Sequence, residues 1–223
     1  NGGVSVTPAN AAWMAEGNQA EAIFGFMVDT AGGVNADGLA NVLVGAIQYD
    51  NGQMDEGAVF VWHGSPTGLN GGSPGTPTNA AWMAESNQVG ALMGRSVTTA
   101  GDVNSDGFDD VIVGTPNYDH GQTDEGAVFV WHGSTSGLNQ GTAGVPANAA
   151  WTAESNQVSA GFGLTVGTVG NVNGDLYDDV IVGSWYYDNN AAPTEIRLCA
   201  AQCTAVQADP NAKVRVLLGC LGG

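Results

Sequence analysis

The stretch GDVNSDGFDDVIVG, residues 101–114, decides the fold that we expect for this chain. It places four carboxylates, Asp102, Asp106, Asp109 and Asp110, within nine residues and continues directly into the apolar run VIV. Like charges at this density repel, and a bound cation is the simplest reason for bringing them together. The β-branched run ends at a glycine, as is typical of a short buried strand. The stretch therefore predicts a cation-binding loop that leads into a β-strand.

Calcium is the cation that this pattern favours, because it takes about six to eight oxygen ligands from carboxylates, amides, carbonyls and water. Alternating positions of the loop would bring the side chains of Asp102, Asn104, Asp106 and Asp110 to one centre, with the carbonyl of Phe108 between them. Gly107 allows the positive φ of an inward turn. The first half resembles an EF-hand loop, but no glutamate and helix follow, so we expect calcium between two strands.

The same sequence motifs recur along the chain at a fixed period. Trp13, Trp82 and Trp151 are 69 residues apart, and the phrase DEGAVFVWHGS begins at both Asp55 and Asp124. The acidic loop follows the same period, as GGVNADGLANVLVG, GDVNSDGFDDVIVG and GNVNGDLYDDVIVG. A unit of this length with several strand-like runs fits a four-stranded propeller blade better than a helical solenoid.

One unit is expected to form strands over residues 94–100, 110–114, 126–132 and 150–154. In the third strand, alternation places Ala127, Phe129 and Trp131 on one face and Val128 and Val130 on the other. Both faces are apolar, as expected for a blade packed between two neighbours. The repeated tryptophan is expected to pack between blades; the alternative is that it stacks on a ligand.

Composition supports an all-β protein with many glycine-rich turns, because 35 of the 223 residues are glycine. The chain has four Lys and Arg residues in total and 22 Asp and Glu residues, which gives a formal net charge of −18. Such a charge disfavours nucleic acid and anionic membranes as partners and favours cations. The sequence contains no apolar run of about 18 residues that would span a membrane. The chain begins at Asn1, which indicates a processed product or a fragment.

These motifs together resemble the FG-GAP repeats of integrin α subunits and of many bacterial extracellular proteins. The resemblance covers residues 10–195 and rests on the acidic loop with its strand, on Phe24-Gly25 and Phe162-Gly163, and on GAP-like turns that begin at Gly45, Gly114 and Gly183. It implies a β-propeller, usually of about seven blades, with calcium held between the first two strands of a blade. It also implies a secreted or cell-surface protein that acts in adhesion and ligand binding.

The acidic loops are numbered in chain order: loop one begins at Gly32, loop two at Gly101 and loop three at Gly170. Calcium affinity is expected to decrease in the order loop two, loop three, loop one, because ligand charge helps to set affinity. Loop three offers Asn171, Asn173, Asp175, the carbonyl of Tyr177, and Asp179. Loop one offers only Asn35, Asp37 and Asn41, and we expect it to be an empty structural turn. Leu176 replaces the turn glycine of loop two and should strain loop three, although Gly174 could relieve it. The metal-free alternative for loop two is an Asx-rich turn, and Asp109 and Asp178 are expected to face solvent or cap a strand.

The expected organisation is a strand within residues 1–22, blades at 23–91 and 92–160, the first half of a third blade at 161–195, and a divergent tail at 196–223. The tail holds three of the four basic residues and all three cysteines, Cys199, Cys203 and Cys220. It either supplies the last strands of the third blade, over 196–200 and 213–218, or arises from a frameshift. In a secreted protein, Cys220 would pair with one of the other two cysteines.

The sequence contains no nucleophile–base motif, zinc motif or phosphate loop. His63 and His132 are repeated from blade to blade and are expected to belong to the scaffold. We therefore expect a non-enzymatic module for binding, adhesion or self-assembly. One alternative is a lectin that uses exposed aromatics, with Trp62, Trp131, Tyr49, Tyr118 and Tyr187 as candidates. Another is a non-catalytic domain of a larger extracellular enzyme. Three blades cannot close a ring, so we expect a homo-oligomer or filament formed through exposed strand edges, including a strand at 11–16.

Overall fold

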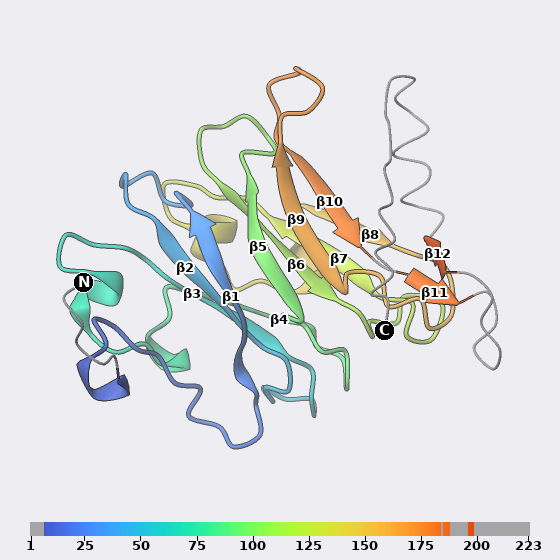
Figure 1. Cartoon of the computed structure of the whole chain (residues 1–223), viewed down its shortest axis with the longest axis horizontal. Coiled ribbons are helices and arrows are strands. Elements are labelled where there is room, and N and C mark those ends of the chain that lie inside the picture. The colour runs from blue at the N-terminus through green and yellow to red at the C-terminus, as the bar shows by residue number, and fades with distance from the viewer. Residues whose placement is uncertain (1–6, 184, 188–195, 199–223) are drawn as a thin grey trace, which may run out of the picture.

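The computed structural model describes residues 7–183, 185–187 and 196–198 of the chain. They form an all-β structure (Figure 1). The strands are β1 (Phe24–Gly32), β2 (Asn41–Ala46), β3 (Ala58–Trp62), β4 (Trp82–Glu85), β5 (Ser96–Gly101), β6 (Asp110–Thr115), β7 (Ala127–Trp131), β8 (Trp151–Glu154), β9 (Thr165–Gly170), β10 (Asp179–Gly183), β11 (Trp185–Tyr187) and β12 (Ile196–Leu198). Short 3-10 turns lie at η1 (Pro8–Asn10), η2 (Leu69–Gly72), η3 (Pro77–Asn79), η4 (Leu138–Gly141) and η5 (Pro146–Asn148).

Two sheets of four antiparallel strands form the first and second blades, in the order β1-β2-β3-β4 and β5-β6-β7-β8. Strands that follow one another in these two sheets pair as hairpins, so each of the first two 69-residue units makes one meander, as predicted. The third blade is represented by β9 paired with β10, while β11 pairs with β12. The predicted strands of the second unit match the structure within one or two residues at each end. These sheets confirm the prediction of propeller-type blades.

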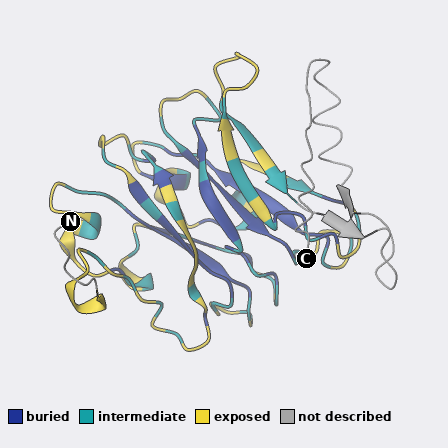
Figure 2. Ribbon diagram, in the orientation of Figure 1, coloured by how far each residue is buried: buried dark blue, intermediate teal, exposed yellow. Residues whose placement is uncertain are grey.

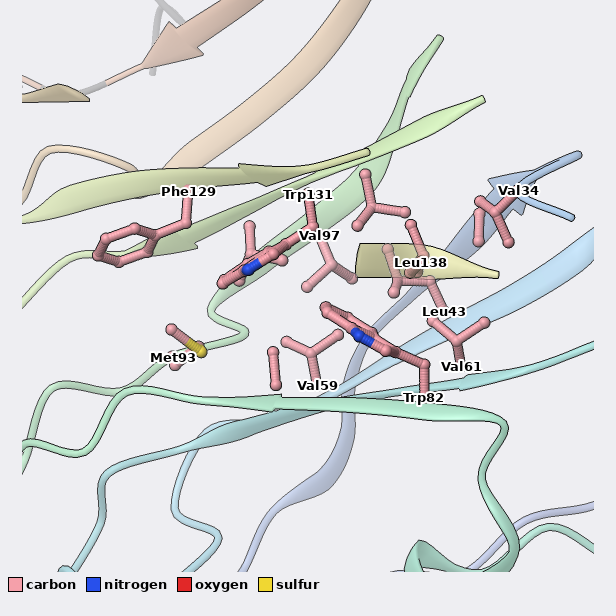
Figure 3. Close-up of a cluster of buried hydrophobic side chains, with 14 of the residues drawn as sticks. Val34, Leu43, Val59, Val61, Trp82, Met93, Val97, Phe129, Trp131 and Leu138 are labelled. Carbon is pink, nitrogen blue, oxygen red and sulfur yellow. The ribbon is translucent and has the colours of Figure 1, made fainter. Parts of the chain in front are cut away.

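The second blade lies between its neighbours, and its strands are largely buried (Figure 2). Strand β7 contributes one apolar face to each neighbour. Ala127, Phe129 and Trp131 pack into the core shared with the first blade, which also contains Val59, Val61 and Trp82 (Figure 3). Val128 and Val130 pack into a second core with residues of the third blade. The alternation of β7 therefore assigned its two faces correctly, because both sides of an internal blade are buried.

The inner strands β1, β5 and β9 fan out from one another in Figure 1, and backbone glycines let adjacent blades approach closely. A Cβ atom on Gly45 would overlap the carbonyl oxygen of Gly94, and one on Gly114 would overlap the carbonyl oxygen of Gly163. Gly94 and Gly163 also have φ values of +86° and +88°. These glycines of the repeat are required because two backbones touch at each junction.

The segment 11–16, expected to be a strand, instead makes one parallel bridge, from Ala15 to Gly75. It still takes the place that β4 takes one unit later, because Ala84 bridges Gly144 in the same way. Trp13 packs edge-on against Trp62 at a centroid distance of 5.7 Å. The expected cysteine pairing and the predicted strand over residues 213–218 fall outside the described residues, whereas β12 lies within the first predicted tail strand.

Candidate functional site

The candidate site is the acidic loop that joins the first two strands of each blade. Loop one connects β1 to β2, loop two connects β5 to β6, and loop three connects β9 to β10. In all three loops the chain turns through residues of positive φ: Ala36, Ser105 and Gly174, followed by Gly38, Gly107 and Leu176. The repeat in sequence is therefore a repeat in backbone conformation.

Loop two is organised by its own carboxylates, which accept hydrogen bonds from backbone amides. The two carboxylate oxygens of Asp102 accept from the amides of Asp106, at 3.0 Å, and Gly107, at 2.8 Å. Asp106 accepts from the amide of Phe108 at 3.0 Å and from the side-chain amide of Asn104 at 2.9 Å. These are the bonds of an Asx-rich turn, and each carboxylate oxygen keeps a further lone pair for another ligand.

Asp110 is fully buried at the start of β6 and connects three segments. Its Oδ1 accepts from the amide of Gly133, after β7, at 2.8 Å, and its Oδ2 accepts from the amide of Val103 at 3.0 Å. Burial raises the pKa of this carboxyl to about 7; the two amide bonds oppose the rise, and the charges of Asp106 and Asp102 add to it. A positive ion beside Asp110 would favour its ionised form.

The donor chemistry of loop two fits a hard cation such as calcium, but its acidic side chains are not arranged as a ready-made group of metal ligands. Asp102, Asp106 and Asp110 lie close enough to repel one another, and all their oxygens are of the type that calcium prefers. Asn104 and Asp106 line a cavity of about 280 Å³ together with His132. Among the described residues, however, no three acidic, histidine or cysteine side chains are grouped as metal ligands. The calcium site therefore stays a prediction.

Loop three shares several of the local hydrogen bonds of loop two, but Asn171 accepts from the amide of Gly174 where Asp102 accepts from Asp106 and Gly107. Asp175 accepts from the amide of Tyr177 and from the side chain of Asn173, and Asp179 accepts from the amide of Val172. Leu176 has a φ of +83°, close to the +89° of Gly107. Gly174 therefore does not remove the expected strain, because a branched residue is held in the left-handed region.

Loop one is held together mainly by an amide. The Nδ2 of Asn41 donates to the carbonyl of Gly32 at 2.7 Å, and its Oδ1 accepts from Gly64 at 3.0 Å. Asn41 is buried, whereas Asp37 is exposed and bonds within its loop to Asn35 and Leu39. These bonds make loop one an ordered turn, and the expectation that it binds no calcium stays a prediction.

Asp109 and Asp178 do not serve only to cap their own strands, and that expectation was wrong. Asp109 Oδ2 accepts from the amide of Gly33 in the first blade at 2.6 Å, and Asp178 Oδ2 accepts from the amide of Asp102 in the second blade at 3.0 Å. Their own amides donate back to the carbonyls of the same two partners. Each aspartate therefore joins its loop to the loop of the preceding blade. The sequence feature that could have revealed this role is that an aspartate recurs at positions 109 and 178, one 69-residue period apart.

Replacing Asp109 by alanine should destabilise the junction between the first and second blades. The amide of Gly33 loses a charged acceptor in a partly buried place, which typically costs about 1–3 kcal/mol. The midpoint of thermal unfolding should fall by about 2–4 °C for each kcal/mol. Asp29→Ala is the matched control, because among the described residues the Asp29 carboxylate accepts only from the adjacent amide of Thr30. An equal fall in both variants would contradict the role of Asp109 between blades.

Two buried glutamates were missed as organising residues. Glu56 is fully buried and accepts from the amides of Asn51 and Gln53 in its own turn and from Asn87 after β4. Glu125 occupies the same place in the second blade, where it accepts from the amides of His120 and Gln122. The sequence feature that could have revealed them is the repeated Asp-Glu-Gly motif. Burying a carboxylate is unfavourable unless it accepts hydrogen bonds, so a glutamate repeated beside a buried strand is expected to organise its surroundings.

Four of the five aromatic side chains proposed as lectin platforms are described, and they are buried or packed against other rings. Trp62 and Trp131 are fully buried, so these two candidates were wrong. Tyr49 and Tyr118 pack edge-on against Phe60 and Phe129 at centroid distances of 5.2 Å. Nothing is described of the Tyr187 side chain. The repeated tryptophan packs between blades at position 82, where Trp82 is 4% exposed, whereas Trp151 is 45% exposed.

Comparison with known proteins places this geometry in a family context. Residues 93–131, which include loop two, match the model of the FG-GAP repeat. Integrin alpha-PS2 of Drosophila melanogaster is 33% identical over 183 residues, which are 77% of this chain and 12% of the relative. Integrin alpha-6 of Homo sapiens is 30% identical over 152 residues, 68% of this chain and 12% of the relative. Integrin alpha-8 of Gallus gallus is 29% identical over 174 residues, 76% and 15% respectively. The chain thus spans a small part of the length of these relatives.

Proposed function

The chain contains an FG-GAP repeat, and on that premise we propose that it is a secreted, non-enzymatic interaction module whose blades are stabilised by calcium. One observation carries the proposal. Loops two and three each join the first two strands of a blade, offer several oxygen donors close together in sequence and contain no lysine or arginine. Within the described part of the chain, the contact of a histidine with a carboxylate lies elsewhere, between Nδ1 of His120 and Glu154. Adhesion and ligand binding are the roles that the family resemblance suggests.

In loop two, calcium would be held by the side chains of Asp102, Asn104, Asp106 and Asp110 and by the carbonyl of Phe108. Asp110 already links the start of β6 to the end of β7, and Asp102 lies just after β5. An ion between them would relieve the repulsion of three carboxylates and hold β5 to β6. In loop three the corresponding ligands would be Asn171, Asn173, Asp175, Asp179 and the carbonyl of Tyr177, with one carboxylate fewer and therefore weaker binding.

Removing calcium should lower the stability of the folded chain. An ion that binds only the folded state, at a hundredfold excess over its dissociation constant, contributes about 2.7 kcal/mol. For a domain of this size this corresponds to about 5–10 °C in the midpoint of thermal unfolding. The measurement compares unfolding in calcium with unfolding in a chelator, monitored by circular dichroism.

Asp106→Asn is the informative variant for this experiment. The asparagine keeps an oxygen acceptor for the amide of Phe108 but removes one ligand charge, so the calcium-dependent shift should shrink. Asp29→Asn, outside the loops, should keep the full shift. Equal melting in calcium and chelator for the unmodified chain would exclude the calcium proposal.

A protein ligand is a better expectation than a glycan, because the four proposed aromatic platforms whose side chains are described are buried or packed against phenylalanines. A glycan array that gives specific binding would reverse this preference. Clustered acids could in principle serve glycoside chemistry, but acids that recur in every blade are better explained as metal or structural loops. Among the described residues, no helix is both long and apolar enough to cross a membrane.

A further inference from the structure

Loops two and three are joined by a reciprocal pair of hydrogen bonds between one residue of each. The amide of Asp102 donates to Oδ2 of Asp178 at 3.0 Å, and the amide of Asp178 donates back to the carbonyl of Asp102 at 3.0 Å. The two chains approach so closely that a Cβ atom on Gly101 would overlap the Asp178 carboxylate. We call this pair of bonds the Asp178 clasp. It uses only the backbone of Asp102, so the side chain of Asp102 serves its own loop.

Both sides of the clasp adjoin the residues that we propose as calcium ligands. Asp102 is the first ligand of loop two, and its carboxylate accepts two backbone amides of that loop. Asp178 lies between Tyr177 and Asp179, which would supply a carbonyl and a carboxylate in loop three. Asp179 also accepts from the amide of Val172 at 2.9 Å, so it already ties the two ends of loop three together. Ordering either loop therefore fixes one side of the clasp.

The clasp can open and close, because it lies between loops with exposed tips. Asp102 and Asp178 are partly exposed, and hydrogen bonds at such positions open at a low cost in free energy. An ion in one loop fixes its ligands and favours the closed clasp, and a second ion then binds a loop that is already partly ordered. Loop three gains most from this, because it has one ligand carboxylate fewer and holds Leu176 at a φ of +83°.

We propose that calcium ions bind to loops two and three with positive cooperativity, coupled through the Asp178 clasp. The inference rests on the proposed function, since it requires calcium in both loops. Coupling between two sites is reciprocal and typically changes an affinity about 5- to 150-fold, and for a single pair of hydrogen bonds we expect about fivefold or somewhat more. Loop two has the larger ligand charge and fills first, so the coupling tightens the binding of calcium to loop three.

Electrostatics oppose the coupling and have to be separated from it. The ligand carboxylates of loop two, Asp102, Asp106 and Asp110, give a formal charge of −3 when the loop is empty and −1 when calcium is bound. Filling loop two therefore weakens the attraction of loop three for a cation. Mobile ions screen this effect over about 8 Å at physiological ionic strength, whereas the clasp is a direct contact and is not screened.

The decisive experiment measures the calcium affinity of loop three by isothermal titration with calcium chloride, with loop two filled or silenced. The double substitution Asp102→Asn and Asp106→Asn silences loop two and keeps oxygen acceptors for its backbone amides. The silenced loop keeps one ligand carboxylate, so its formal charge equals that of the filled loop. Loop three should bind calcium about fivefold more weakly, or weaker still, when loop two is silenced. Adding Asp175→Asn should weaken the remaining site further, which assigns that site to loop three.

Asp178→Ala tests whether the clasp carries the coupling. The alanine removes the acceptor for the amide of Asp102 and retains every proposed calcium ligand. In this background, silencing loop two should change the affinity of loop three by less than about twofold, because the two sites then act independently. Asp109→Ala is the matched control: it removes the same contact at the junction with loop one and should leave the full difference between filled and silenced loop two. Circular dichroism shows that each variant is folded.

The outcomes separate this inference from the calcium proposal on which it rests. Two bound ions with an affinity of loop three that ignores the state of loop two would overturn the cooperativity and leave the calcium proposal standing. A difference that persists in Asp178→Ala, or that Asp109→Ala removes equally, would exclude the clasp as its cause. An unmodified chain that binds no calcium would overturn both proposals.

Discussion

Trp82→Ala should lower the free energy of unfolding by about 3–5 kcal/mol, the cost of removing a buried tryptophan from a packed core. Trp82 is 4% exposed at the junction of the first two blades, where its ring meets that of Trp131 edge-on at 5.4 Å (Figure 3). Its indole Nε1 also donates to the carbonyl of Thr142 at 2.8 Å. The midpoint of thermal unfolding should fall by about 6–20 °C, measured by circular dichroism or calorimetry.

Trp151→Ala is the matched control, because the repeat places Trp151 where it places Trp82. Trp151 is 45% exposed, so its truncation should cost about 1 kcal/mol or less. Similar losses in the two variants would show that the sequence position, and not the packing between blades, sets the contribution of this tryptophan.

Gly45→Ala should destabilise the chain by about 1–3 kcal/mol or more, because an added methyl group has no room at the junction of two blades. The new Cβ would overlap the carbonyl oxygen of Gly94, which is backbone and cannot rotate away. The first and second blades would have to separate, and the core shown in Figure 3 would loosen with them. Urea unfolding should give a lower midpoint with a similar slope.

Gly33→Ala tests whether this loss is steric. A Cβ on Gly33 would meet only Asp109, at 3.6 Å, and the amide that Asp109 accepts from is retained. This variant should therefore stay within about 0.5 kcal/mol of the unmodified chain. If Gly45→Ala were equally mild, the close approach of β2 to Gly94 would not be a constraint on the fold.

The strand order and the two faces of β7 could be predicted because both follow from local pattern. An alternation of period two assigns Phe129 and Val130 to opposite faces whatever they later contact. The acidic loop was predictable for the same reason, since its turn is made by nearby side chains such as Asp102 bonding to nearby amides.

The segment 11–16 was harder to predict than the strands of the second unit. Its sequence matches that of β4. A strand, however, needs a neighbouring strand along its length, and within the described residues this segment makes only the bridge of Ala15 to Gly75. Asp109 was misassigned because its partner, Gly33, lies one unit earlier in the chain. Segments with the same sequence motif therefore formed different structures where their neighbouring segments differed.

The amino-acid sequence by itself determined the 69-residue unit, its meander of strands, the apolar faces and the conformation of the acidic loops, since each depends on residues close together in the chain. Only the tertiary structure decided which copy of a repeated residue is buried. Trp82 and Trp151, or Val97 and Val28, have the same local sequence position and opposite exposure. The physical reason is that burial at a blade face is contributed by the adjacent blade, so among the described residues it depends on what packs against that face and not on the residue itself.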